Sequence, residues 1–189
     1  MGLAKYLRQA WEKPDKEALR KRMIEWRAEG TVTRVENPLR LDRAHSLGYK
    51  AKKGVFMVRV KVLRGGHRRP RPKKGRMSRR MHTLLNLKMN YQQICEQKAA
   101  RKYPNCEALN SYWIGKDGMH YFYEVIMVDR SAPEIKTDKQ LSFLTVPANK
   151  KRIFRGLTSA AQKARGLRNS NFKVPKVRPS LRANNRQGN

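Results

Sequence analysis

Acidic residues are scarce in this chain of 189 residues. Aspartate and glutamate together number 14, against 45 lysines and arginines, so the formal net charge is +31 and the pI is near 11.0. A like-charge excess of this size opposes compaction unless a partner neutralises it. RNA or DNA is the expected partner, because each phosphate contact made by a lysine or arginine releases a counterion.

Long hydrophobic runs are absent as well. No run of 18 apolar residues exists to span a bilayer, and the N-terminal stretch MGLAKYLRQAWEK lacks the apolar core and cleavage pattern of a signal peptide. An anionic membrane surface is a weaker alternative to nucleic acid, because no basic helix with a broad apolar face and no lipidation signal is visible. We expect a cytoplasmic protein without a membrane partner.

Residues that carry catalysis or hold metals are few and scattered. The two cysteines, Cys95 and Cys106, are expected to be reduced thiols, and no CxxC or HxxxH spacing joins them to a histidine in a metal site. No serine stands in a GxSxG elbow, and Gly65-Gly66 lacks the spacing of a nucleotide-binding loop. Composition does not exclude a nuclease or a modifying enzyme, but nothing in the sequence supports one, and we expect no enzyme, no metal, no cofactor and no small-molecule substrate.

The stretch from Lys50 to Arg80 predicts a strand followed by a basic arm. Residues 55–63, VFMVRVKVL, alternate as a half-buried strand does. Residues 64–80 then hold nine lysines and arginines, one histidine and no acid, so they need an external polyanion to become ordered. We predict a basic arm inserted at 64–86. Its RNA-binding residues are Arg64, Gly65, Gly66, His67, Arg68, Arg69, Arg71, Lys73, Lys74, Arg76, Arg79 and Arg80.

The segment before that strand, LGYKAKKG at 47–54, places three lysines and one tyrosine between glycines. It is either a turn with a solvated face or a clamp on backbone phosphates in which Tyr49 stacks on a base or sugar. We favour the clamp, because the segment leads directly into the strand and the basic arm. Lys50, Lys52 and Lys53 are its predicted RNA-binding residues.

Helical periodicity is clearest at 87–103, where Pro104 ends the pattern, and two further helices are predicted at 3–12 and from Pro14 to Gly30. Trp11 and Trp26 are expected to pack in the core, with base stacking as the alternative.

A hairpin is predicted from 108–115 and 119–129 around the turn KDG. The second strand is apolar on both faces, apart from Glu124, which is typical of a central strand covered twice. Residues 131–146 are expected to hold a short helix and then a strand over 141–146.

The region from Lys139 to Asn189 holds thirteen lysines and arginines and no acid. Within it, RGLTSAAQKARGL at 155–167 predicts a short helix, capped either by Ser159 in a capping box with Gln162 or by Thr158. The helix start, next to Arg152 and Arg155, suits a phosphate, and an ordinary capped surface helix is the alternative. Basic residues expected to meet RNA here are Arg152, Arg155, Lys163, Arg165 and Arg168.

These elements predict an α+β fold with a small, mostly antiparallel sheet flanked by helices and long basic extended arms. We expect a mixed α/β globular domain over 1–148, with N-terminal helices and the arm inserted at 64–86. A basic C-terminal extension with one short helix follows over 149–189, and its last twenty residues should be disordered without a partner.

Six separated motifs, in order, resemble a known family. They are MGxxKYLxxxW at the start, LGYKAKKG at 47–54, VRVxVxRGG at 58–66, LNSYWIGKDG at 109–118, YEVIMVD at 123–129 and RGLTSAAQKARGL at 155–167. The chain is similar over almost its full length to the ribosomal protein "fifteen-e" of archaeal and eukaryotic large subunits. Its early C-terminal end favours the archaeal type.

The resemblance implies a structural constituent of the large ribosomal subunit that binds and stabilises folded large rRNA and lies beside neighbouring ribosomal proteins. It also implies which positions meet rRNA: Lys50, Lys52, Lys53, Arg64, Gly65, Gly66, Arg155, Gly156, Thr158, Ser159, Arg165 and Gly166. In the last motif, alanine stands at Ala161 where the family pattern has glycine. A free nucleic-acid-binding module and an RNA-modifying enzyme are the competing hypotheses.

Overall fold

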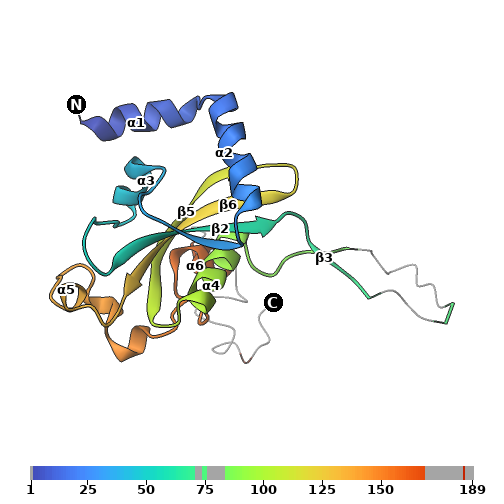
Figure 1. Cartoon of the computed structure of the whole chain (residues 1–189). Coiled ribbons are helices and arrows are strands. Elements are labelled where there is room, and N and C mark those ends of the chain that lie inside the picture. The colour runs from blue at the N-terminus through green and yellow to red at the C-terminus, as the bar shows by residue number, and fades with distance from the viewer. Residues whose placement is uncertain (1, 71–73, 76–83, 169–184, 186–189) are drawn as a thin grey trace.

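A four-stranded antiparallel sheet forms the centre of the computed structural model, which describes residues 2–70, 74–75, 84–168 and 185. The strand order is β1-β2-β6-β5. The strands are β1 (Val32–Val35), β2 (Val55–Leu63), β5 (Cys106–Lys116) and β6 (His120–Asp129). Helices flank the sheet (Figure 1), so the predicted α+β class is confirmed.

The hairpin of β5 and β6 provides half of this sheet, as its alternating pattern predicted. β6 pairs with β2 from Val55 opposite Val128 to Leu63 opposite His120, and with β5 on its other side. β6 is therefore a central strand, and residues 124–128 of it are buried from both faces. β5 pairs with β6 only, which leaves one long edge of β5 unpaired within the sheet.

Each face of the sheet has its own apolar core. On one face, α4 (Tyr91–Lys102) packs Cys95 and Ala99 against valines of β2 and β6. On the other face, Trp26 of α2 (Lys16–Ala28) and Ala44 of α3 (Leu41–Ser46) pack against Phe122 and its neighbours. α1 (Leu3–Glu12) lies beside α3 (Figure 1).

Two aromatic predictions meet different outcomes. Trp26 is 4% exposed and lies edge-on to Phe122, with ring centroids 5.3 Å apart, so its predicted packing role is confirmed. The proposed stacking of Tyr49 on a base is wrong. Its side chain is 8% exposed, because the turn after α3 directs the ring into the core on the α2 and α3 side of the sheet.

The strand predicted over 141–146 is also wrong. After the short helix α5 (Pro133–Lys136), the chain forms two 3-10 turns, η1 (Ser142–Leu144) and η2 (Pro147–Asn149). Leu141 and Leu144, three residues apart, are both buried against Val128 and Ile135. A spacing of three places both side chains on one face of a 3-10 turn, whereas in a strand they would point to opposite faces.

The helix predicted at 87–103 begins later than expected. Asn90 caps α4, because its side-chain oxygen accepts a hydrogen bond from the Gln93 amide at 2.8 Å. Residues 87–89 therefore precede the helix.

The folded body continues past residue 148, the boundary predicted from the sequence. Ile153 is fully buried in the α4-side core, and α6 (Ser159–Ala164) packs on α4. Asn90 Nδ2 also donates to the Ala160 carbonyl at 2.9 Å. The first part of the predicted extension over 149–189, up to the end of α6, thus packs on the body, and residues 169–184 and 186–189 of it lie outside the described residues.

Candidate nucleic-acid interface

The lysines of segment 47–54 divide into two kinds. Lys50 Nζ lies 3.3 Å from the Asp138 carboxylate, and Lys52 Nζ donates to the same carboxylate and to the Glu134 carbonyl. The ammonium group of Lys52 holds the pKa of Asp138 well below its ordinary value. Lys53 is exposed and has no side-chain partner among the residues that the structure describes. Only Lys53 is therefore unpaired in the predicted clamp.

The arm leaves the body at the end of β2 and is anchored there. Arg64 Nη1 donates to the Asp117 carbonyl at 2.7 Å, and its guanidinium lies 5.2 Å from the Tyr121 ring centroid. The Gly65 amide donates to the Tyr91 hydroxyl at 2.8 Å, and that hydroxyl donates to the Gly65 carbonyl at 3.2 Å. Arg64 and Gly65 thus fix the direction in which the arm departs.

A glycine is required where the two sides of the arm meet. β3 (His67–Arg68) pairs with β4 (Leu84–Leu85) in a short antiparallel ladder. A Cβ at Gly66 would lie 2.2 Å from the Leu85 carbonyl oxygen, a distance that real structures do not allow. Gly66 therefore allows a close approach of two backbone segments, and the segment approached is the returning side of the arm itself.

Within that ladder and beyond it, the arm exposes basic side chains. His67, Arg68, Arg69 and Lys74 are exposed, and their side chains have no partner within the described ranges. β3 runs away from the body (Figure 1). The other predicted contacts of the arm, Arg71, Lys73, Arg76, Arg79 and Arg80, lie outside the described residues.

The C-terminal region uses several of its predicted contacts internally. Arg155 donates to the Ala148 and Lys150 carbonyls, and Arg165 Nη1 donates to the Gly156 carbonyl at 3.0 Å. Arg168 bonds weakly, at 3.4 Å, to Gln162. Arg152 is half-buried, and its guanidinium lies 5.5 Å from the Phe143 ring centroid. Lys163 is exposed without a described partner.

The cap of α6 is Thr158, the alternative to Ser159. The Thr158 hydroxyl accepts from the Ala161 amide at 3.3 Å and donates to Glu96 at 2.7 Å, and the residue is 1% exposed. Ser159 is half-buried and Gly166 ends the helix at a φ of +74°. The start of this six-residue helix faces a buried carboxylate, so Thr158 is placed to hold the helix on the body.

Glu96 is the residue that sequence reasoning missed here. It is fully buried, and its two oxygens accept from Ser111 of β5 at 2.5 Å and from Thr158 at 2.7 Å. Burial raises the pKa of Glu96, while both hydroxyls and the charge of Arg152 act to lower it. Glu96 thus joins α4, β5 and α6. In the sequence, Glu96 could have been noticed because it stands beside Cys95 in a helix whose other polar residues are mostly glutamines, lysines and arginines.

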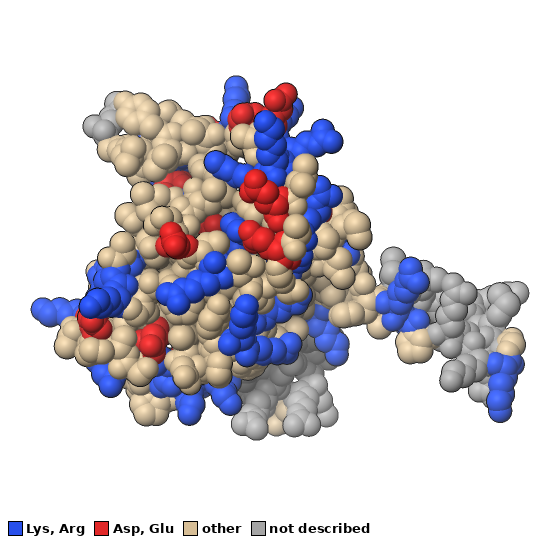
Figure 2. All heavy atoms as spheres, in the orientation of Figure 1, with Lys and Arg blue, Asp and Glu red and all other residues tan. Residues whose placement is uncertain are grey.

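Charge is unevenly spread over the molecule. On the face drawn in Figure 2, Lys and Arg side chains lie along the lower body, on the arm and around α2, and the Asp and Glu side chains gather mainly among those around α2. Within the described part of the chain, no cluster of three or more His, Cys, Asp or Glu is suited to a metal ion. None of the described helices is long and apolar enough to cross a membrane.

Comparison with known proteins places this geometry in context. The model of a family described as Ribosomal L15, in its L15e form, matches residues 2–184. The chain is also 48% identical over 185 residues to the large ribosomal subunit protein eL15 of Picrophilus torridus, and the match covers 95% of each chain.

Proposed function

The chain belongs to this Ribosomal L15 (L15e) family of structural ribosomal proteins, which are not enzymes, and from that premise we propose that its basic segments bind and stabilise folded rRNA of the large subunit. The chain is a large-subunit protein whose place is the ribosome in the cytoplasm. Its proposed partners are large-subunit rRNA and the ribosomal proteins that lie beside it.

The observation that carries the proposal is the set of unpaired cations on the arm. Arg68, Arg69 and Lys74 are exposed and have no protein partner among the described residues, although most half-buried cations of the body are hydrogen-bonded. Unpaired guanidinium and ammonium groups on an extended segment are suited to phosphates, because each contact gains counterion-release free energy.

The body acts as a rigid support in this mechanism. Arg64 and Tyr91 fix the start of the arm, and the Gly66 contact with Leu85 closes its base. Fixed attachment lowers the conformational entropy lost when the arm meets RNA. Recognition is expected to depend on the shape and backbone of the RNA rather than on a base code.

A salt titration with matched variants tests the proposal. We expect binding of the full-length protein to large-subunit rRNA to weaken linearly in log K against log salt, with a slope of about −0.9 per duplex phosphate contacted. The test variant changes Arg68, Arg69 and Lys74 to glutamine. The control changes Arg20, Lys21 and Arg22 of α2 to glutamine. These residues are also exposed, and the change removes the same charge.

The arm variant should reduce the slope by up to about 2.7, whereas the control should change it by less than about one. Equal slopes for the two variants would mean that only net charge matters and that the arm has no particular role. Fluorescence and circular dichroism of both variants check that the body remains folded.

A further inference from the structure

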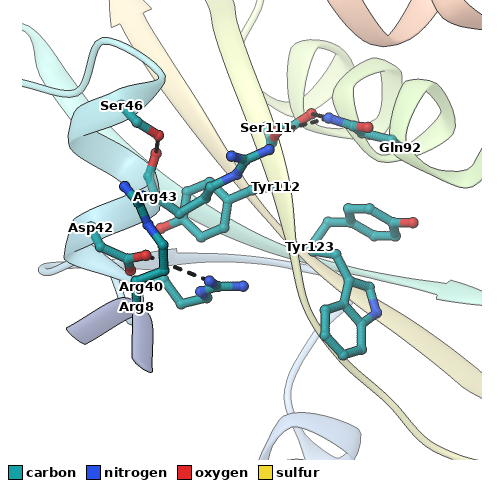
Figure 3. A pocket seen from close by; sticks show the side chains of 10 residues that line it. Arg8, Arg40, Asp42, Arg43, Ser46, Gln92, Ser111, Tyr112 and Tyr123 are labelled. Atoms are coloured by element: carbon teal, nitrogen blue, oxygen red, sulfur yellow. Dashed lines mark hydrogen bonds and ion pairs between the residues drawn. The ribbon is translucent and has the colours of Figure 1, made fainter. Parts of the chain in front are cut away.

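A polar cavity of about 380 Å³ opens beside β5, the strand at the unpaired edge of the sheet. One side of it is lined by Arg8 of α1, by Arg40 at the N-cap of α3 and by Arg43 within α3. Gln92 of α4 and Tyr123 of β6 line the other (Figure 3). Its volume is within the range of small-ligand sites, which is about 300–1,000 Å³.

Two buried atoms of this cavity lack a hydrogen-bond partner. The Asp42 side chain is 2% exposed, and its Oδ2 lies 3.5 Å from Arg40 Nη2, but its Oδ1 has no partner among the residues described. The buried Arg40 Nε is likewise unpaired within the described chain. One member of the ion pair thus offers an acceptor and the other a donor. Leaving a buried polar atom unpaired is unfavourable, and a ligand with matching groups would remove that cost.

The exposed rim of the cavity supplies charge and an aromatic surface. The guanidinium groups of Arg8 and Arg43 are exposed, with no hydrogen bond or ion pair to the part of the chain that the structure describes. Trp113 also lines the cavity and is 41% exposed. Arginines bind phosphate oxygens, and an exposed tryptophan face stacks on a base.

The residues behind the cavity hold it in shape. Buried Glu124 accepts from the Tyr112 hydroxyl at 2.5 Å and from the Leu39 amide at 3.1 Å. The first contact fixes β5, and the second fixes the residue before Arg40. The Arg40 guanidinium also lies 4.9 Å from the Trp11 ring centroid. The site is therefore formed before a ligand arrives, which lowers the entropic cost of binding.

We propose that this cavity binds one unpaired nucleotide of the RNA, with its base amino group donating to Asp42 and its phosphates meeting Arg8 and Arg43. Adenine and cytosine fit best, because each presents an amino donor beside a ring-nitrogen acceptor, which matches Asp42 Oδ1 and Arg40 Nε. The base of the adjacent nucleotide stacks on Trp113, because the Trp113 side chain alternates with that of Tyr112 and so lies on the α4 side of β5. The proposal rests on the rRNA-binding function above and adds a base-reading site on the body, away from the arm.

The first test measures binding of a fluorescent tetra-adenylate to the full-length protein by anisotropy. Trp113→Ala should weaken binding about tenfold, because stacking on an aromatic side chain is typically worth this much or more. The control is Phe154→Ala, which removes an aromatic ring that is similarly exposed, at 44%. We expect that control to bind within about twofold of the wild type. An equal effect of both variants, or none from Trp113→Ala, would overturn the proposal.

The second test pairs a change in the protein with a change in the RNA. Unsubstituted purine differs from adenine only in lacking the amino group. We expect this replacement in the RNA to weaken binding to the wild-type protein by roughly fivefold or more. In Asp42→Ala, the loss should shrink to less than about twofold, because no side-chain acceptor remains. A loss of equal size in both proteins would contradict the assigned contact, whatever the stability of the variant.

A third arm separates a nucleotide within RNA from a free one. Adenosine monophosphate should bind at least tenfold more weakly than the tetra-adenylate, since it lacks the neighbouring phosphates that Arg8 and Arg43 are placed to meet. Equal affinity would overturn the RNA assignment. The salt slope of the arm variant tests the proposed function independently of these three experiments. The two proposals can therefore fail separately.

Discussion

Replacing Thr158 with valine tests how the C-terminal region is held on the body. Valine has nearly the shape of threonine but no hydroxyl. The change therefore removes the cap of α6, which accepts from the Ala161 amide at 3.3 Å, and the donor to Glu96 at 2.7 Å. The site is 1% exposed, so water cannot readily replace either bond.

The magnitude follows from the two lost bonds. Loss of a helix N-cap typically costs about 1 kcal/mol. Leaving the buried Glu96 oxygen without its donor costs about 1–3 kcal/mol. We therefore expect Thr158→Val to lower the free energy of unfolding by about 2–4 kcal/mol, a large share of the stability of a small domain.

Urea unfolding followed by tryptophan fluorescence measures this change. Thr158→Ser should recover most of the loss, because it restores the hydroxyl. Ser159→Ala is the matched control. Its half-buried hydroxyl has no partner in the described chain, so its effect should stay within about 0.5 kcal/mol. If Thr158→Val unfolds at the wild-type urea concentration, or if Ser159→Ala is the more damaging change, the assigned cap is wrong.

Three further predictions concern pH, the arm and the lysine clamp. Burial raises the pKa of Glu96 above the ordinary 4.5, so the contribution of Glu96 to stability should decline as pH rises from about 4.5. Glu96→Gln should flatten that decline in urea midpoints measured from about pH 4.5 to 7.5. Parallel pH curves for the two proteins would refute this prediction. Gly66→Ala should open the ladder at the base of the arm and speed amide exchange at Leu85, since its Cβ would lie 2.2 Å from that carbonyl, whereas Gly118→Ala, with nothing within 4 Å, should not. Asp138→Asn should release two lysines and steepen the salt dependence of rRNA binding by up to about 0.9 per lysine that meets a phosphate; an unchanged slope would mean that these lysines stay away from RNA.

The fold was predictable where periodicity is strong. The hairpin of β5 and β6, the strand β2 and the helix α4 all follow from alternating or helical patterns. The region 141–146 was not, because an apolar run of this length fits a strand or a 3-10 turn equally well. Its shape is decided by Leu141 and Leu144 packing against Val128, a contact between segments distant in sequence.

The family was identified from its motifs, and that prediction is confirmed. Individual roles at the interface were harder to assign. Composition alone does not distinguish Lys52, which binds Asp138, from Lys53, which is unpaired. Likewise, Tyr49 is buried although its segment is basic. The assignment of a basic or aromatic residue to RNA depends on whether the body already uses it, and only tertiary contacts reveal that.

The most direct test of the central claim is the incorporation of the arm variant into large subunits in cells. Tagged protein with Arg68, Arg69 and Lys74 changed to glutamine is followed by sedimentation of the extract at moderate and high salt. We predict that it remains at the top of the gradient, while the α2 control with Arg20, Lys21 and Arg22 changed sediments with the large subunit. Incorporation of the arm variant at the wild-type level, resistant to high salt, would contradict the claim that the arm attaches this protein to rRNA.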